Sequence, residues 1–329
     1  MKQAMMLLPA ENRDRIYSPE VIAQIRRLAR LADCCDLVGN LEALRPALAE
    51  TDVILSGWGM MKLDREFLDA APRLAAVLYG AGSVRFFLTD EYWRRKILLT
   101  SAWAANAIPV IEYTIAAIVF GLKKALQAAE LTRLQRTFAA PPDIRGLYRA
   151  KIGVIGAGMV GSGVLEKLKG YEVETFCYDP FLAPARATQL GTTLMDLDEV
   201  FRTCDCVTLH AANIASTQGM ITGEHFRSMK DGAVFINTAR GAIVREAEMI
   251  EVLKEGRIFA FIDVTDPEPP EPDSPLYTLP NVFLTPHLAG SGGQEVYRQG
   301  EYALEELRRF VNSEPPRYPV TQDMMEWMA

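Results

Sequence analysis

A glycine-rich hexapeptide, Gly156-Ala157-Gly158-Met159-Val160-Gly161, is the feature that most constrains how this chain can fold. It follows the apolar run 152–155 and opens a segment that favours a helix to about Lys169. In such a unit the first glycine permits a tight turn, the second lets backbone approach a pyrophosphate, and the third allows close packing. The amides at the helix N-terminus would hold the anion. A dinucleotide-binding domain is therefore predicted, and a simple packing turn is the alternative.

Asp179 closes the next apolar run, residues 173–178, and supports the same interpretation. An aspartate at the end of the second strand can bind the ribose hydroxyls of a dinucleotide, and it repels a 2′-phosphate. The position thus favours NAD over NADP. The alternative is that Asp179-Pro180 only opens a turn.

The length of 329 residues exceeds what one core usually supports, so two domains are expected. Apolar runs alternate with helix-like stretches before and after the glycine loop, which predicts two parallel α/β sheets. A mostly apolar helix from 107 to about 137 is expected to lie buried between domains or subunits. The predicted strands are residues 1–9, 52–55, 74–79, 97–100, 152–155, 173–178, 206–210, 233–237, 259–264 and 282–285, and the further helices are 19–31, 64–70 and 292–312.

Composition excludes several classes of protein. The net charge of −7 argues against a general nucleic-acid surface, since phosphate binding relies on Lys and Arg. No uncharged run reaches 18 residues and the first nine residues do not resemble a secretion signal, so a cytoplasmic chain without a membrane span is expected. The five cysteines are an odd number, and Cys204-x-Cys206 lacks the spacing of a zinc site, so buried thiols and no metal are predicted.

Three segments after residue 200 carry reactive side chains at predicted strand ends. Arg240 follows the run 233–237, Asp263 and Glu268 lie in and after the run 259–264, and His287 follows the run 282–285. Ligands of open α/β sheets bind at the carboxyl ends of the strands, so these residues are candidates for an active site. Taken singly, each could instead be a surface or loop residue.

These segments, in this order after the glycine loop, resemble the D-isomer-specific 2-hydroxyacid dehydrogenase family. Residues 106–113 and Thr208-Leu209-His210 with Thr217 also match, and the resemblance covers about residues 52–313. It implies two doubly wound parallel-sheet domains, with a Rossmann-type NAD domain inserted into a flavodoxin-like substrate domain. The implied bounds are 1–104 with 293–329 for the substrate domain and 105–292 for the NAD domain. Pairing through residues 108–122 implies a homodimer.

By this resemblance Arg240 anchors the substrate carboxylate and carbonyl, His287 is the acid/base, and Glu268 orients the histidine. A guanidinium can grip the planar carboxylate of a keto acid by two bonds. Hydride arrival at carbon places charge on oxygen, so a proton donor is needed within hydrogen-bond reach. Histidine changes protonation near neutral pH, and a neighbouring carboxylate favours its charged form.

The resemblance also implies binding residues beyond the catalytic three. Ala81, Gly82 and Ser83, with Arg240, would bind the substrate carboxylate, although a plain glycine turn is the alternative for this loop. Asp179 would bind ribose, Asp263 the carboxamide, and the two other histidines, His210 and His225, would serve packing and surface roles. The full set of implied cofactor contacts is Gly156, Gly158, Met159, Val160, Gly161, Asp179, Ala212, Thr217, Thr238, Ala239, Arg240, Asp263, His287 and Gly290.

The expected activity is NAD-dependent interconversion of a small 2-hydroxy acid and its 2-keto acid, as in glyoxylate and hydroxypyruvate reductases. A phosphoglycerate dehydrogenase-like relative is disfavoured because residues 56–61 are uncharged and aromatic. Formate and phosphite dehydrogenase-like relatives are further alternatives. A non-catalytic NAD-sensing scaffold, as in the corepressors of this family, is the alternative from another class.

Overall fold

The computed structural model describes residues 1–326 and divides into two compact units. Unit 1 comprises residues 1–107 and the chain from Ser291 onward, and unit 2 is the continuous segment Ile108–Gly290. The sequence had placed these two boundaries at 104/105 and 292/293. The last three residues of the predicted segment 293–329 lie outside the described residues.

Unit 1 is built on a five-stranded parallel sheet in the order β2-β1-β3-β4-β5, the flavodoxin-like arrangement. Along β1, Met5 faces one core cluster while Ala4 and Met6 face the other, so both faces of the sheet are covered. The strands are β1 Gln3–Met6, β2 Arg30–Asp33, β3 Val53–Ser56, β4 Ala76–Tyr79 and β5 Leu98–Ser101, and the helices are α1 Ala10–Ile16, α2 Pro19–Leu28, α3 Leu41–Leu48, α4 Arg65–Ala70, α5 Asp90–Arg94 and α13 Tyr297–Val311.

Helix α2 corrects the prediction for residues 19–31. The helix begins as expected, with Ser18 Oγ accepting a hydrogen bond from the Val21 amide and Pro19 in the first turn. It ends at Leu28, and β2 follows at once because Leu31 pairs in register with Ala4 of β1. Sheet pairing therefore overrides the helical propensity of the last three residues.

The two edges of the unit 1 sheet are protected in different ways. Beside β5, the Ser101 amide donates to the Tyr318 carbonyl and the Val320 amide donates to the Leu99 carbonyl, so a returning segment covers that edge. At the other edge, β2 is four residues long and carries charged Arg30 and Asp33. Short charged edges and covered edges both discourage pairing with foreign strands.

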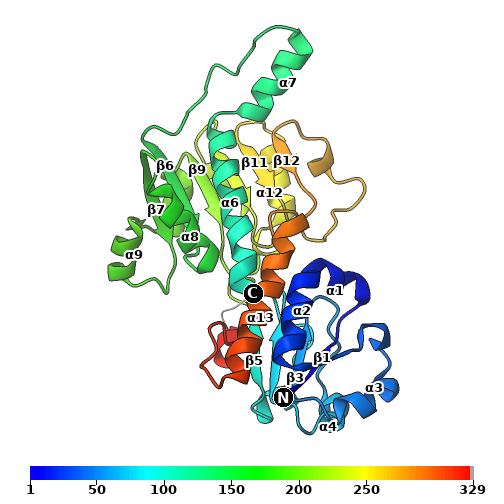
Figure 1. Ribbon diagram of the computed structural model, residues 1–329. Coiled ribbons are helices and arrows are strands. Elements are labelled where there is room, and N and C mark those ends of the chain that lie inside the picture. The colour runs from blue at the N-terminus through cyan, green and yellow to red at the C-terminus, as the bar shows by residue number, and fades with distance from the viewer. Residues whose placement is uncertain (327–329) are drawn as a thin grey trace. The chain divides into compact units, whose positions relative to one another are not determined.

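Unit 2 holds a seven-stranded parallel sheet in the order β12-β11-β10-β9-β6-β7-β8 (Figure 1). This confirms the doubly wound domain predicted around the glycine loop. Its strands are β6 Ala150–Ile155, β7 Val173–Tyr178, β8 Thr193–Leu194, β9 Cys206–Leu209, β10 Val234–Asn237, β11 Phe259–Ile262 and β12 Val282–Leu284, and its helices are α6 Trp103–Leu122, which starts in unit 1, α7 Ala125–Gln135, α8 Met159–Leu168, α9 Pro184–Leu190, α10 Leu197–Thr203, α11 Gly223–Ser228 and α12 Glu246–Leu253.

Helices α6 and α7 replace the single helix predicted from 107 to about 137. The break falls at Lys124, which adopts a left-handed conformation with φ 49°. Helix α6 is long and apolar enough to cross a membrane by length and composition, yet half of that stretch is buried and Ile118 and Leu122 lie in the core of unit 2. Helix α7 buries no residue and, within unit 2, projects from the sheet (Figure 1).

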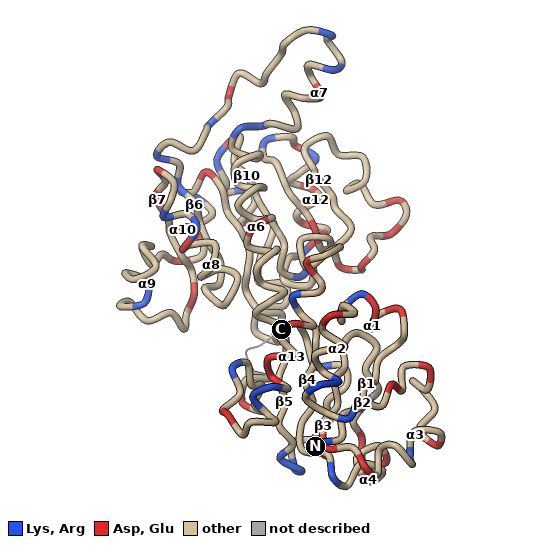
Figure 2. The backbone as a smooth tube through the Cα atoms, in the orientation of Figure 1, with Lys and Arg blue, Asp and Glu red and all other residues tan. Residues whose placement is uncertain are grey.

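Charged side chains are spread over many elements of both units (Figure 2). Most of the ion pairs join neighbours on one helix or loop, such as Arg133 with Glu130 on α7. A buried exception is Asp205, which accepts hydrogen bonds from Arg145, Lys230 and the Lys151 amide. Asp205 thereby ties the segment after α7 to the start of β6.

Candidate active site

The candidate site residues of unit 2 lie in loops that follow neighbouring parallel strands. The glycine loop follows β6, Arg240 follows β10, Glu268 follows β11 and His287 follows β12. Because the strands are parallel and β12, β11, β10, β9 and β6 are adjacent, their carboxyl ends form one edge. The strand order reverses between β6 and β9, where ligands of such sheets bind.

The glycine loop has the geometry that a pyrophosphate cradle requires. Gly156 has φ +88°, and a Cβ there would lie 2.7 Å from the Ala211 amide nitrogen. A Cβ at Gly161 would lie 1.9 Å from the Gly156 carbonyl oxygen, so only glycine lets α8 pack on the loop. At Gly158, the N-cap of α8, a Cβ would meet nothing within 4 Å. Two glycines thus serve packing, and the middle one leaves open space at the helix N-terminus.

Asp179 lies at the end of β7 and is bound to the glycine loop itself. Its Oδ2 accepts the Ala157 amide at 2.7 Å, and its Oδ1 accepts the Phe181 amide at 2.8 Å. The carboxylate is therefore fixed beside the loop that the sequence assigned to the pyrophosphate. This position fits recognition of a ribose next to that group.

Arg240 begins a tight connection between β10 and the loop after β11. Its Nη1 donates to the Ala239 carbonyl at 2.6 Å, and the side chain is partly buried. The next residue, Gly241, packs against backbone: a Cβ there would lie 2.0 Å from the Thr265 carbonyl carbon. The arginine is thus held where two strand-end loops touch.

His287 and Glu268 form a direct pair. His287 Nδ1 and Glu268 Oε1 are 2.5 Å apart, and both side chains are close to half exposed. His287 adopts φ 51°, a left-handed conformation that costs energy in a non-glycine residue and that persists only where surrounding contacts enforce it. With Nδ1 engaged by the carboxylate, Nε2 is the nitrogen available for proton transfer.

Asp263 supplies those contacts, a role that the sequence did not suggest. Its Oδ1 accepts the Thr285 hydroxyl and the Leu288 amide, and its Oδ2 accepts the Ala289 amide. Its own carbonyl accepts the His287 amide at 2.9 Å. The carboxylate predicted to bind the carboxamide therefore has both oxygens engaged by the loop that carries His287. A strand-end aspartate two dozen residues before a Thr-Pro-His segment is the only sequence signal for this role.

Other predicted cofactor residues take part in hydrogen bonds near the ends of their strands. Thr217 Oγ1 donates to the Ala212 carbonyl at 2.5 Å and closes the turn after β9. The Thr238 hydroxyl lies 3.3 Å from that of Thr114 on α6, and the Ala239 amide donates to Asn237 Oδ1. Gly290 is the last residue of unit 2. These contacts fix backbone at the same edge of the sheet as the glycine loop.

The two other histidines take structural roles. His210 Nε2 lies 2.9 Å from the Thr208 hydroxyl, and burial lowers the pKa of His210 to about 3, so its ring is neutral. The prediction that His225 lies on the surface is wrong, because its side chain is only 12% exposed. His225 Nδ1 accepts the Thr222 amide and thereby caps α11.

The predicted substrate loop, residues 80–83, follows β4 in unit 1. Ser101 Oγ contacts the Ala81 carbonyl at 2.8 Å and the Gly82 carbonyl at 2.6 Å. Ala81 is buried, whereas Gly82 and Ser83 are partly exposed and a Cβ at Gly82 would meet nothing within 4 Å. The Ser101 side chain thus holds the loop through two of the loop's backbone carbonyl groups.

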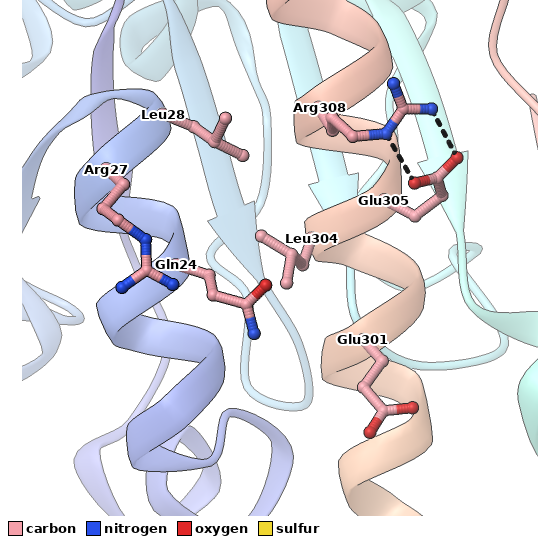
Figure 3. A pocket seen from close by; sticks show the side chains of 7 residues that line it. All are labelled: Gln24, Arg27, Leu28, Glu301, Leu304, Glu305 and Arg308. Atoms are coloured by element: carbon pink, nitrogen blue, oxygen red, sulfur yellow. Dashed lines mark hydrogen bonds and ion pairs between the residues drawn. The ribbon is translucent and has the colours of Figure 1, made fainter.

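A groove of about 270 Å³ lies elsewhere in unit 1, between α2 and α13 (Figure 3). Arg308 on its wall is bound to Glu305 by two hydrogen bonds and also to Glu314. Arg308 and Glu305 neutralise each other, and this groove gives no indication of a ligand. It is lined by Gln24, Arg27, Leu28, Glu301, Leu304, Glu305 and Arg308.

Comparison with known proteins agrees with this arrangement. Residues 115–289 match the family model described as the NAD binding domain of D-isomer specific 2-hydroxyacid dehydrogenases. The chain is also 33% identical over 269 residues to a D-3-phosphoglycerate dehydrogenase from Archaeoglobus fulgidus, covering 80% of this chain. The chain belongs to the D-isomer specific 2-hydroxyacid dehydrogenase family.

Other family members differ in what their names say they act on. A glyoxylate reductase from Thermofilum pendens is 28% identical over 337 residues, with 95% of this chain and 96% of that protein covered. An NAD-complexed D-isomer specific 2-hydroxyacid dehydrogenase from Lactobacillus delbrueckii ssp. bulgaricus shares the fold, with a TM-score of 0.79 and 20% identity over 97% of this chain and 100% of that one. This dehydrogenase-family chain spans about half the length of the phosphoglycerate dehydrogenases that it matches.

The five cysteines of this family member are buried thiols. Cys34, Cys35, Cys177, Cys204 and Cys206 are all free and buried, as the sequence predicted. No group of three His, Cys, Asp or Glu side chains suited to a metal occurs among the described residues. Burial raises the pKa of the Cys177 thiol to about 12, so it stays protonated.

Proposed function

We propose that this protein catalyses NAD-dependent reduction of a small 2-keto acid to its 2-hydroxy acid, and the reverse reaction. The observation that carries the proposal is the His287–Glu268 pair at 2.5 Å, on the sheet edge that also holds Arg240 and the glycine loop. An acid/base, an anion anchor and a dinucleotide cradle are the three parts this reaction needs. Residues 105–292 would form the NAD domain and residues 1–104 with 293–329 the substrate domain.

The residues fit NAD as the cofactor. The open space at Gly158 lets a pyrophosphate approach the free amides of Met159 and Val160, and Asp179 lies fixed beside that loop. When bound, NADH supplies a hydride to carbon 2 of the keto acid and becomes NAD⁺. The carboxylate of Asp179 disfavours the 2′-phosphate of NADPH.

In this mechanism, each of four side chains of unit 2 has its own role. The Arg240 guanidinium binds the substrate carboxylate and carbonyl and draws electron density from the carbon that is to be reduced. As charge develops on the carbonyl oxygen, His287 donates its Nε2 proton and the hydroxyl forms. Glu268 orients the ring and stabilises the imidazolium before transfer. Asp263 holds the loop in place throughout.

The decisive experiment removes the proton donor. His287→Ala should lower turnover of the best keto acid by about 10² to 10⁴, with NADH affinity nearly unchanged. His225→Ala is the matched control, because it removes a histidine that caps α11 and contacts Asp198 and Phe201 but has no part in the proposed mechanism. Near-parent turnover in His287→Ala would refute the mechanism. Glyoxylate, hydroxypyruvate and pyruvate are the first substrates to screen.

Cofactor preference has its own test. Dissociation constants for NADH and NADPH, measured by fluorescence titration, should favour NADH. Asp179→Ser should narrow the difference because the repelling carboxylate is gone. A parent protein that binds the two equally would contradict the role given to Asp179.

We also propose a homodimer in the cytoplasm that needs neither membrane nor nucleic acid. Large apolar side chains are exposed along α6, α7 and the chain after them: Phe120 at 51%, Leu134 at 64% and Phe138 at 99%. Solvent exposure of such residues over one region favours a second copy as the cover. Light scattering at micromolar concentration should give the mass of a dimer, and a stable monomer would contradict the proposal.

A further inference from the structure

Arg15 and Trp58 form a pair at the carboxyl edge of the unit 1 sheet that none of the assigned roles uses. The Arg15 guanidinium carbon lies 5.3 Å from the centre of the Trp58 ring. Arg15 is in the last turn of α1 and is exposed, and Trp58 is in the loop directly after β3. The two residues are 43 positions apart in the sequence.

The loop that carries Trp58 is fixed rather than free. A Cβ at Gly57 would lie 2.4 Å from Ile16 Cδ1, and one at Gly59, where φ is +87°, would lie 2.6 Å from the Pro9 ring. The Asn12 side chain donates to the Trp58 carbonyl at 3.0 Å. Residues 57–59 are thus packed against α1 and the residue before it, and the indole also packs on both core clusters of unit 1.

The same end of α1 touches the predicted substrate loop. A Cβ at Gly80 would lie 2.8 Å from the Tyr17 hydroxyl and 3.0 Å from Ile16 Cγ2. The Tyr17 hydroxyl donates to the Ser56 carbonyl at the end of β3. Residues 15–17 therefore bridge the loops after β3 and β4, and Arg15 belongs to the edge that holds residues 80–83.

The charge of Arg15 has no partner within its unit. Among the described residues, no carboxylate lies within ion-pair distance of Arg15, and the neighbouring Asp14 is bound to Arg13. A guanidinium that stacks on an indole keeps its N–H edge free for hydrogen bonds. A carboxylate or a phosphate is the natural partner of that edge.

We propose that Arg15, held by Trp58, binds a second anionic group at the far end of the substrate. The substrate is then a 2-keto acid with a distal carboxylate or phosphate. This deepens the proposed function and rests on it. Residues 56–61, at the end of β3 and in the loop after it, are uncharged, which had argued against a phosphorylated substrate, but α1 brings the cation of Arg15 to Trp58.

The test compares keto acids of similar length with and without a second anion. The carboxylate arm sets 2-oxoglutarate and oxaloacetate against 2-oxopentanoate and 2-oxobutanoate, and the phosphate arm sets 3-phosphohydroxypyruvate against hydroxypyruvate. Arg15→Gln should lower kcat/KM about 10- to 100-fold for the preferred anionic substrate, because a charge-assisted hydrogen bond is lost. For the matched keto acid without a second anion, kcat/KM should change less than twofold. Arg26→Gln, an exposed arginine of α2, is the matched control and should change neither.

Each outcome decides the proposal. If Arg15→Gln lowers kcat/KM in one arm only for the substrates with a second anion, the proposal is supported and the anion is identified. Trp58→Leu should then reproduce part of that fall in kcat/KM. A parent enzyme that prefers the keto acids without a second anion overturns the proposal, and so does an Arg15→Gln variant that lowers kcat/KM equally for both kinds of acid. If no keto acid is reduced, the proposed function fails instead, and calorimetric titration of 2-oxoglutarate and 3-phosphohydroxypyruvate with NAD⁺ present decides this proposal. Binding that Arg15→Gln weakens at least tenfold supports it, and absent or unchanged binding overturns it.

Discussion

The carboxyl edges of the two sheets have the same architecture and differ in how firmly their loops are held. In unit 2, the Asp263 carboxylate accepts three hydrogen bonds from the loop that carries His287. Gly241 packs directly on the backbone of Thr265. In unit 1, the loop at Gly82 has open space, and the cation of Arg15 is exposed. Proton transfer needs a fixed side chain, whereas recognition of an anion can use an accessible cation and free backbone. By the roles proposed above, two sheets of one fold class would carry different tasks through their loops.

Gly241→Ala tests how closely the loops at the unit 2 edge pack and should have the largest effect on the free energy of unfolding. The new methyl would overlap the Thr265 backbone, so the loops after β10 and β11 must separate. We expect a loss of about 3 kcal/mol or more in the free energy of unfolding. Chemical denaturation measures it. Gly158→Ala, where a Cβ meets nothing, is the control, and equal losses in the two variants would contradict the packing argument.

His210→Gln tests the buried group behind the same edge. Burial lowers the pKa of His210 to about 3, whereas an unfolded histidine titrates near 6.5. The unfolded chain therefore takes up a proton that the folded chain refuses, so the parent loses stability as pH falls from about 6.5 toward 3. Between pH 7 and pH 5 this contributes up to about 2 kcal/mol. Denaturation at the two pH values should show that the free energy of unfolding falls less between pH 7 and pH 5 in His210→Gln than in the parent. An identical fall in both proteins would count against the burial of the ring.

Glu268→Gln separates the orientation of His287 from its charge. The amide can still bond Nδ1, but the imidazolium loses its neighbouring anion during proton transfer. Turnover of the best keto acid should therefore fall about tenfold, less than in His287→Ala, while NADH affinity stays nearly unchanged. Glu271→Gln in the same loop is the control. Parent-like turnover would exclude Glu268 as the partner.

Gly82→Ala tests the unit 1 edge and should have the smallest effect on the free energy of unfolding. A methyl at Gly82 meets no neighbour within 4 Å, so the free energy of unfolding should change by less than about 0.5 kcal/mol. If the loop binds the substrate carboxylate through its amides, KM should rise while kcat changes little. A stability loss similar to that of Gly241→Ala would remove the distinction between the two edges.

The sequence was sufficient for the parts of the molecule that depend on local pattern. The glycine loop, the place of Asp179 after a strand and six of the seven strands of unit 2 follow from period and turn residues, whereas the two-residue strand β8 was not predicted. The pairing of Glu268 with His287 came from family resemblance, and the structure brings the two side chains together. The break at Lys124 has no proline to mark it, and β2 depends on pairing with β1 rather than on its own residues. Arg15 could not be connected to Trp58 because only the packing of α1 brings these distant positions together.

The division of unit 1 into two stretches of chain has a consequence for folding during synthesis. Val296, Ala303 and Leu307 complete one of its two core clusters, and all three are made after the whole of unit 2. Unit 2 is continuous and can close its core while the ribosome is still adding residues. The first-made strands, β1 to β5, must wait, with one face only partly covered by α1 and α2, until α13 emerges. Slow elongation after residue 290 would therefore lengthen the exposure of unit 1 to aggregation and leave unit 2 largely unaffected.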